Sequence, residues 1–213
     1  MIAVIDYEAG NLTSVQRALN ALGHESVITR NPSDVIAADK VIIPGVGAAG
    51  KAMSDLKRMK LDSAIRDAYA RGKPILGICL GTQIIMEWSR ENDTPCLGLI
   101  GGEVRRFPEN HVDHDGSRLK VPHMGWNEVE LKQVHPLFQG VDPDSAFYFV
   151  HAYYPAPANP DNVLGETSYG IFFASVLEAG NLVAVQFHPE KSGRPGLKIL
   201  SNFCTWNGGD HAQ

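Results

Sequence analysis

The sequence predicts a single α/β domain: a three-layer sandwich with a mostly parallel central sheet, helices on both faces and an antiparallel extension in the C-terminal half. Apolar β-like runs alternate with helical stretches in the first half, which favours parallel strands covered by helices. From about Leu97, short strands follow one another with turn signals between them. A chain of 213 residues with 44% hydrophobic content suits one core. We expect one domain over residues 1–207 and a flexible tail over 208–213.

The N-terminal half should contain four strands with helices between them. "IAVID" is the first strand, and a helix over 11–22 follows, with Asn11 as N-cap and Gly23 as its stop. "SVIT" and "KVIIP" are the next strands, and one long amphipathic segment covers about 51–71. "PILGI" is the fourth strand, and it precedes a helical run over 80–91.

The C-terminal half reads as a more antiparallel extension of the sheet. Its strand-like segments are "GEVRRF", "LKVPHMGWNEVEL", "FYFVHAYY" and "GIFFASVLEAGNLVAVQF". A last helix, "GLKILSNFCTW", should pack Leu197, Leu200 and Phe203 inward.

Composition argues against several kinds of partner. The formal charge of −5 gives no basic footprint for nucleic acid or an anionic membrane. No secretory leader opens the chain, and no apolar run reaches the roughly 18 residues of a membrane helix, so we expect a cytosolic protein. The three cysteines are an odd number without C-x-x-C spacing, which favours a free working thiol over disulfides or zinc.

The strongest chemical signal is "GICLG", Gly77 to Gly81, between a strand and a helical run. G-x-nucleophile-x-G in that context is typical of a nucleophile elbow, whose glycines relieve crowding in a sharp turn. Cys79 would then lie at a helix N-terminus, where the dipole favours the thiolate, and the N–H of Leu80 would face a developing oxyanion. The alternative is a buried structural cysteine between packing glycines.

A base and an orienting acid are available in "VAVQFHPEKSG". His188 and Glu190 are two residues apart at the end of an apolar strand, so both side chains can face one side of the sheet. Glu190 could hold His188 in the tautomer that accepts the proton of Cys79. Surface strands often produce H-x-E, so the pair gains meaning only together with the elbow.

The glycine-rich stretch "IIPGVGAAGKA" fits two phosphate-binding patterns but lacks the context of either. A P-loop needs Ser or Thr after its lysine, and Ala52 stands there. A dinucleotide-binding loop follows the first strand of its fold and precedes an acidic residue about 20 residues later, whereas this loop follows the third strand. We therefore do not expect a bound nucleotide.

Taken together, these motifs resemble the class I, or triad, glutamine amidotransferases. "GICLGTQ" and "QFHPEKSG" match the whole class. "IDYEAGNL", "PGVGAAG", "VPHMGWN" and "FYFVHAYY" narrow the resemblance to the glutaminase subunits of imidazole glycerol phosphate synthases. The matching blocks run from Ile5 to Gly193 and so cover nearly the whole chain. Thr82, Ala152 and "YEAGN" depart from the usual pattern without removing a triad group.

The resemblance implies a reaction and its residues. Glutamine would be hydrolysed to glutamate and ammonia through a γ-glutamyl thioester on Cys79, with His188 moving the proton and Glu190 orienting it. No cofactor and no metal are implied. The "PGVG" segment would be the oxyanion strand beside the nucleophile, with the N–H of Leu80 as the first oxyanion donor and that of Val46, next to Gly47, as the second.

Substrate and partner residues follow from the same resemblance. Gln83 and Glu91 would bind glutamine, with an ordinary exposed acid as the alternative for Glu91. Tyr153, with His151, matches a segment near the glutamine pocket, although "FYFVHAYY" equally suits a buried strand. The remaining residues implied lie at a heterodimer interface with a (β/α)₈-barrel cyclase: Asn11, Trp126, which is alternatively a core residue, and Lys191.

Two further interpretations stay open at this stage. "HVDHDGSR", residues 111–118, crowds together four potential metal ligands, but Asp115-Gly116 between β-like runs is a hairpin-turn signal and favours a polar loop. The rival functions are a glutaminase serving another synthase, a cysteine hydrolase that needs no partner, and a subunit that acts by binding alone.

Overall fold

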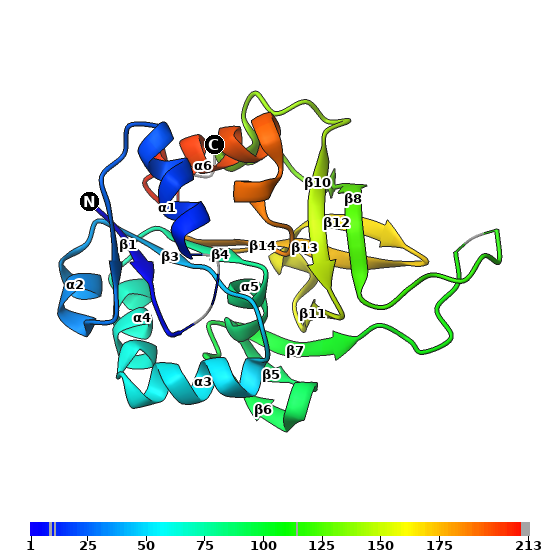
Figure 1. Cartoon of the computed structure of the whole chain (residues 1–213), viewed down its shortest axis with the longest axis horizontal. Helices are drawn as coiled ribbons and strands as arrows, with labels where there is room; N and C mark the ends of the chain where they lie inside the picture. Colours follow the sequence, from blue (N-terminus) through cyan, green and yellow to red (C-terminus); the bar gives the residue numbers. More distant parts are fainter. Residues whose placement is uncertain (9, 11, 114, 210–213) are drawn as a thin grey trace.

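The structure, a computed structural model, describes residues 1–8, 10, 12–113 and 115–209, and its centre is an eight-stranded sheet (Figure 1). The strands in spatial order are β2 (Ser26–Thr29), β1 (Ile2–Ile5), β3 (Lys40–Ile43), β4 (Ile75–Ile78), β14 (Leu182–Val185), β13 (Ile171–Ala179), β12 (Val163–Tyr169) and β9 (Glu130–Leu131). The first five strands are parallel, and β14 to β9 pair antiparallel. The predicted parallel sheet with an antiparallel extension is therefore confirmed.

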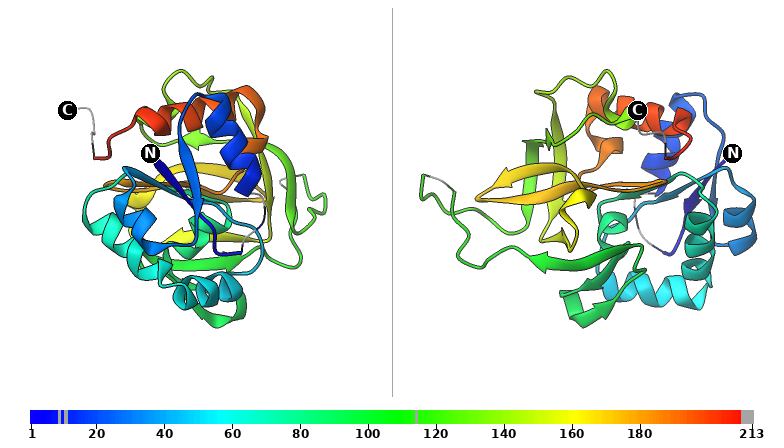
Figure 2. Two further views of the ribbon diagram at one scale, coloured as in Figure 1. Left: turned by 60° about the vertical axis from the view of Figure 1, so that its left-hand side comes forward. Right: turned by 180° about the vertical axis from the view of Figure 1, so that it is seen from behind.

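Helices cover both faces of the sheet and complete the predicted three layers (Figures 1 and 2). Successive strand residues point to opposite faces, so Ile42 joins one core and Ile43 the other. The residues of β1, β4 and β14 are all buried, as expected for strands covered on both sides. On one face lie α1 (Leu12–Ala21) and α6 (Gly193–Thr205); on the other lie α2 (Pro32–Ala37), α3 (Ala49–Arg58), α4 (Leu61–Ala70) and α5 (Leu80–Ile84).

The long helical segment expected over 51–71 is in fact two helices. Met59 is the C-cap of α3, and Lys60 takes a φ of 61° before α4 begins. A residue in this left-handed region cannot continue a right-handed helix, so the chain turns there. Each helix then presents its own apolar stripe to the core, with Leu56 from α3 and Ile65 from α4.

The prediction of a helix over 80–91 is also wrong, since α5 covers only the first turn and a half of that range. α5 ends at Ile84 because carbonyls that a longer helix would use are bonded elsewhere: Ile84 accepts from the N–H of Leu97, and Ile85 from that of Leu99, both at 2.8 Å. The chain instead forms β5 (Met86–Ser89) and a 3₁₀ turn, Glu91–Asp93.

Two smaller sheets flank the main one and divide the segment "FYFVHAYY". β10 (Ala146–His151) pairs with β8 (His123–Glu128), and the two form the ribbon beside β12 in Figure 1. After Ala152 the chain continues as β11 (Tyr153–Pro157), which belongs to a different sheet. That sheet also contains β5, β6 (Thr94–Pro95) and β7 (Ile100–Arg106).

The other short elements are 3₁₀ turns at Pro136–Phe138, Pro160–Asn162 and Pro189–Lys191. Within the described ranges, every helix is too short or too polar to cross a membrane.

Candidate active site

Cys79 lies in a sharp turn between β4 and α5, as the elbow pattern predicts. Its φ of 54° and ψ of −103° are a conformation that L-residues rarely adopt. The turn is held by a 2.9 Å hydrogen bond from the N–H of Cys79 to the carbonyl of Val185. A Cβ on Gly81 would lie 1.8 Å from the carbonyl oxygen of Ile43, and one on Gly77 would lie 2.9 Å from a β14 side chain. The packing at the elbow therefore requires both glycines.

His188 and Glu190 form a buried pair beside this turn. The 3₁₀ turn after His188 brings the carboxylate back, so that imidazole Nδ1 and Oε1 of Glu190 are 2.8 Å apart. Because a carboxylate only accepts, Nδ1 carries a proton and Nε2 is left to face the thiol. Nε2 is buried, and Cys79 is the side chain besides Glu190 with which the ring interacts by hydrogen bonding.

The electrostatics of His188 show that Cys79 is within interaction range. Burial acts to lower the pKa of His188, but the side chains of Cys79 and Glu190 outweigh it and raise the pKa to about 9. The imidazole is therefore protonated at neutral pH. The pair His188 and Glu190 therefore lies beside Cys79, from which it is far apart in the sequence.

The predicted oxyanion strand lies directly over the elbow, in a conformation that fills the oxyanion site. The N–H of Leu80 donates to the carbonyl of Gly45 at 3.3 Å. The carbonyl of Pro44 is held in turn by the hydroxyl of Tyr7, at 2.6 Å. Gly47 takes a φ of 103°, which glycine adopts at little cost. One of the two predicted donors is thus occupied by the strand itself.

A pocket of about 290 Å³ opens beside Cys79 and contains all three predicted glutamine-binding residues. Nε2 of Gln83 donates to the carbonyl of Tyr153 at 2.9 Å and to Oε1 of Gln186 at 3.3 Å. With both amide protons used, Gln83 can offer only its oxygen, an acceptor, to a ligand. The residues lining the pocket are Val46, Gly47, Cys79, Leu80, Gln83, Glu91, Pro122, Val150, His151, Ala152 and Tyr153.

Glu91 reaches the pocket from a 3₁₀ turn and not from a helix face. Its Oε2 accepts the N–H of Ala49 at 2.7 Å, at the first residue of α3. A carboxylate there complements the positive end of the helix dipole. Glu91 therefore links the pocket beside Cys79 to the residues that follow the predicted oxyanion strand, and it is not an ordinary exposed acid.

Two buried histidines form a hydrogen-bonded chain behind the pocket. Nδ1 of His151 lies 2.8 Å from the carbonyl of Tyr153, so it carries the proton and leaves Nε2 as an acceptor. Nδ1 of His123 donates to that Nε2 at 3.1 Å, and Nε2 of His123 accepts from Asn127 at 3.4 Å. The chain is complete only when both rings are neutral. It holds the carbonyl that also receives Gln83.

This histidine pair should make the protein sensitive to mild acid. Burial, followed by neighbouring histidines, lowers the pKa of His123 to about 4 and that of His151 to about 3. Below about pH 6.5 these two histidines bind protons in the unfolded chain but stay neutral in the folded chain. The free energy of unfolding therefore falls as the pH drops from about 6.5 towards 4. We expect His123 alone to account for about 3 kcal/mol over that range.

The measurement is the free energy of unfolding in urea at pH 6.5 and pH 5.0, where most carboxylates stay ionised. His123→Asn should show a smaller loss between these two pH values than the wild type, and His24→Asn serves as the control. Equal losses in all three proteins would contradict the assignment.

Of the predicted partner-facing residues, Trp126 lies on the exposed face of the β8–β10 ribbon, and Lys191 lies beside it at the end of the 3₁₀ turn Pro189–Lys191. Trp126 is 59% exposed, so the alternative of a core tryptophan is wrong. Its ring packs edge-on against that of Tyr148, and the ammonium of Lys191 lies 5.9 Å from the centre of the Tyr148 ring. Met124 extends the same exposed face. Asn11 lies outside the described residues.

The described residues of the segment 111–118 form a turn, as expected from its Asp-Gly pair, and His114 lies outside the described residues. Val112 bridges Arg118 across it, and Gly116 takes a φ of 84°. Asp115 accepts the N–H of Ser117, and His111 is buried with its Nε2 bonded to the carbonyl of Tyr169. No group of three or more metal-ligand side chains occurs among the residues described.

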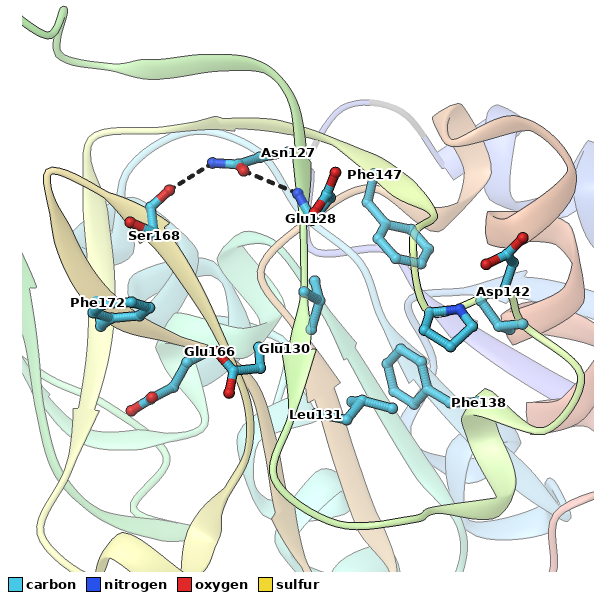
Figure 3. A pocket seen from close by; sticks show the side chains of 13 residues that line it. Asn127, Glu128, Glu130, Leu131, Phe138, Asp142, Phe147, Glu166, Ser168 and Phe172 are labelled. Atoms are coloured by element: carbon cyan, nitrogen blue, oxygen red, sulfur yellow. Dashed lines mark hydrogen bonds between the residues drawn. The ribbon is translucent and has the colours of Figure 1, made fainter. Parts of the chain in front are cut away.

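A larger pocket, of about 560 Å³, lies elsewhere on the molecule (Figure 3). It is lined mainly by apolar side chains such as Leu131, Phe138 and Phe172, with carboxylates such as Glu166 among them. Asn127 donates there to the carbonyl of Ser168 at 2.9 Å. None of the predicted site residues lies in it, and no cysteine or histidine is found among its described lining residues. Size alone therefore does not locate the chemistry.

The sequence motifs did not single out two residues that contact the reactive groups. Tyr7 anchors the oxyanion strand through Pro44, and Gln186 contacts Gln83 and Cys79. Gln186 stands inside the motif "QFHPE", two residues before the histidine. Tyr7 stands inside the motif "IDYEAGNL", but its role could not be predicted, because only the fold brings the residues after β1 next to those after β3.

Comparison with known families agrees with this fold. The family model described as glutamine amidotransferase class-I matches residues 3–206. The chain therefore belongs to the class-I glutamine amidotransferase family, and the predicted resemblance is confirmed.

More specific relatives narrow the match. An imidazole glycerol phosphate synthase subunit HisH from Maridesulfovibrio salexigens is 53% identical over 203 residues, which cover 95% of each chain. A protein of the same name from Nitratidesulfovibrio vulgaris is 50% identical over 207 residues, 97% of each chain. A crystal structure of a glutamine amidotransferase, 18% identical, superposes with a TM-score of 0.73 over 96% of this chain and all of that one, and so shows the shared fold.

Proposed function

We propose that this protein is the glutaminase subunit of an imidazole glycerol phosphate synthase, acting in histidine biosynthesis. It hydrolyses glutamine to glutamate and passes the ammonia to a (β/α)₈-barrel cyclase, with which it forms a heterodimer. The observation that carries the chemistry is the buried Cys79–His188–Glu190 arrangement at the pocket. The relatives' names support the choice of synthase.

The first half of the reaction forms the thioester. The proton of Cys79 resides on His188, and the sulfur attacks the γ-amide carbon of glutamine, whose carbonyl oxygen becomes an oxyanion. When this intermediate collapses, Nε2 of His188 gives its proton to the amide nitrogen, and ammonia leaves. Glu190 fixes the ring through Nδ1 and stabilises its positive charge.

The second half returns the enzyme to its resting state. His188, now neutral, takes a proton from water as the oxygen attacks the thioester carbon. The second tetrahedral intermediate expels the sulfur of Cys79 as a thiolate, and glutamate is released. The acceptor oxygen of Gln83 and the carboxylate of Glu91 suit the α-ammonium group of the substrate, since both lie in the same pocket.

The oxyanion strand gives the enzyme an off state. With the carbonyl of Gly45 bonded to the N–H of Leu80, that donor is not available to a substrate oxyanion. Rotation of the peptide between Gly45 and Val46 would remove that carbonyl and turn the N–H of Val46 inward. We propose that the loaded cyclase favours this rotation, which prevents waste of ammonia.

Gly45→Ala should weaken this switch. The new Cβ would lie 1.8 Å from the hydroxyl oxygen of Tyr7 and 3.2 Å from Cβ of Leu80, so the strand must shift. We expect partner-stimulated hydrolysis to fall on the order of 10²-fold, the value of one oxyanion donor. Steady-state glutamate release with the loaded cyclase measures it. In a Tyr7→Phe background, which removes the clashing oxygen, the loss should be smaller; undiminished stimulation of Gly45→Ala would contradict the switch.

Trp126→Ala should weaken binding to the cyclase by about 30-fold or more, because exposed tryptophans at interface centres often act as hot spots. Phe172→Ala is the matched control: Phe172 is also 59% exposed but lies by the larger pocket. Calorimetric titration of each variant with the cyclase gives the Kd. Equal losses, or no loss for Trp126→Ala, would place the interface elsewhere.

One assay tests the proposed function as a whole. Glutamate release is followed for the wild type and Cys79→Ala, with and without a barrel cyclase and its ligand. Release that rises with the loaded cyclase and vanishes in the variant supports the proposal. Hydrolysis of peptides or esters without a partner would favour a cysteine hydrolase, and cyclase activation by Cys79→Ala without added ammonia would favour a binding subunit.

A further inference from the structure

We propose that Gln186 is a further catalytic residue: its side-chain N–H donates to the sulfur of Cys79 and stabilises the thiolate. The proposal deepens the function proposed above and rests on it for the importance of that sulfur. The contact itself is a geometric fact, with Nε2 of Gln186 3.8 Å from Sγ.

The orientation of Gln186 follows from its other contacts. The side chain is fully buried, and its main-chain N–H is bonded to the carbonyl of Ser175 at 2.8 Å, just beyond the end of β14. Its Oε1 accepts from Gln83 at 3.3 Å, and Gln83 is fixed as a donor by its bond to the carbonyl of Tyr153. An amide with its oxygen held there must turn its nitrogen to the sulfur.

The other polar group near the sulfur disfavours the thiolate, so a hydrogen-bond donor is needed to stabilise it. The carbonyl oxygen of Val150 lies 4.0 Å from Sγ, where it can accept from the neutral thiol but repels the thiolate. Gln186 presents the opposite polarity, because its N–H donors favour the ionised form. Hydrogen bonds to charged groups are about twice as strong as neutral ones, so this contact strengthens as the sulfur ionises.

The same donor serves in two steps of the reaction. It stabilises the attacking thiolate before the thioester forms, and it stabilises the sulfur again when the second tetrahedral intermediate breaks its carbon–sulfur bond. In the second step it acts together with His188, which has by then taken the proton of the attacking water and is positively charged. Gln186 carries no net charge and changes no protonation state, so it acts identically in both.

Two substitutions separate donation to sulfur from positioning of Gln83. Gln186→Glu keeps the shape and still offers an oxygen to Gln83, but replaces the donor at the sulfur with an acceptor. Gln186→Met keeps the length and removes both contacts. Gln139→Glu, at an exposed position after the 3₁₀ turn Pro136–Phe138, controls for the added negative charge.

The experiment measures alkylation of Cys79 by iodoacetamide between pH 5 and 9, using the full chain without glutamine or cyclase. Burial raises the pKa of both Cys96 and Cys204 to about 11, so these thiols stay protonated, and peptide mass mapping confirms the site of reaction. Alkylation tests the sulfur directly and does not depend on which synthase the protein serves. Failure of the proposed function would therefore leave this result interpretable.

We expect the alkylation rate at pH 7 to fall at least tenfold in both Gln186 variants, and most in Gln186→Glu, where the carboxylate repels the thiolate. The pH profile should move to higher pH, a change that a merely structural role would not produce. Gln139→Glu should match the wild type. Wild-type rates and profiles in either Gln186 variant, with a melting temperature close to that of the wild type, would overturn the proposal.

Discussion

Replacing His188 with asparagine should lower kcat for glutamine hydrolysis by on the order of 10⁴-fold or more, as loss of the histidine does in comparable triads. The variant loses the general acid that protonates the leaving amide nitrogen when ammonia departs. It also removes the positive charge next to the sulfur, since the pKa of His188 is about 9. Both the thioester-forming and the thioester-cleaving steps should therefore slow.

A second buried histidine offers a matched control for this substitution. His135 is 3% exposed and its Nε2 lies 3.8 Å from a carboxylate oxygen of Glu178, far from the elbow in the fold. His135→Asn should lose stability to a similar extent but keep its kcat. The measurements are steady-state glutamate release with the loaded cyclase and mass detection of acyl-Cys79 after acid quench. Similar kcat losses in both variants would mean that the effect comes from folding.

Gly81→Ala should destabilise the protein by about 3 kcal/mol, the upper part of the usual range for overpacking. The added Cβ would lie 1.8 Å from the carbonyl oxygen of Ile43 and 2.9 Å from its carbonyl carbon. Both atoms belong to the backbone of β3, so no side-chain rotation relieves the contact. We expect the melting temperature to fall by about 10 °C.

Gly101→Ala is the control for Gly81→Ala. Gly101 is an exposed residue of β7, an added Cβ would meet nothing within 4 Å, and its backbone is one that any L-residue adopts. Its free energy of unfolding should stay within about 0.5 kcal/mol of the wild type. Urea unfolding followed by circular dichroism measures both. A Gly81→Ala variant as stable as Gly101→Ala would show that α5 can move away from β3.

The sequence predicted the fold well where local pattern and long-range contacts agree. β1 to β4 are short, mostly apolar runs with helical segments between them, and that pattern can be recognised without tertiary information. The sequence-based predictions are wrong where hydrogen bonds to residues far along the chain determine the local structure. α5 ends because the carbonyls of Ile84 and Ile85 accept hydrogen bonds from the N–H groups of Leu97 and Leu99. No residue within 80–91 indicates this in the sequence. "FYFVHAYY" alternates like one strand, yet its halves pair with different neighbours.

The candidate site was predictable where a motif carries the geometry. The elbow glycines and the H-x-E spacing placed Cys79, His188 and Glu190 near one another before any fold was known. Glu91 was expected on a helix face, and it reaches the pocket by another route. The roles of Gln186 and Tyr7 were not predicted, because no sequence spacing identifies them. The function of a single buried amide or phenol depends on the groups that the tertiary structure places beside it.

Because the carbonyl of Gly45 is bonded to the N–H of Leu80, two kinds of inhibitor should measure two different properties of the site: the reactivity of the sulfur and the access to the oxyanion donor. Iodoacetamide develops no negative oxygen when it reacts, so its rate depends only on the nucleophile. An aldehyde analogue of glutamine forms a hemithioacetal, whose oxygen requires the very amide that the strand now covers. A change in aldehyde affinity without a change in the iodoacetamide rate therefore reports a change in the fraction of molecules with an open strand, without any turnover.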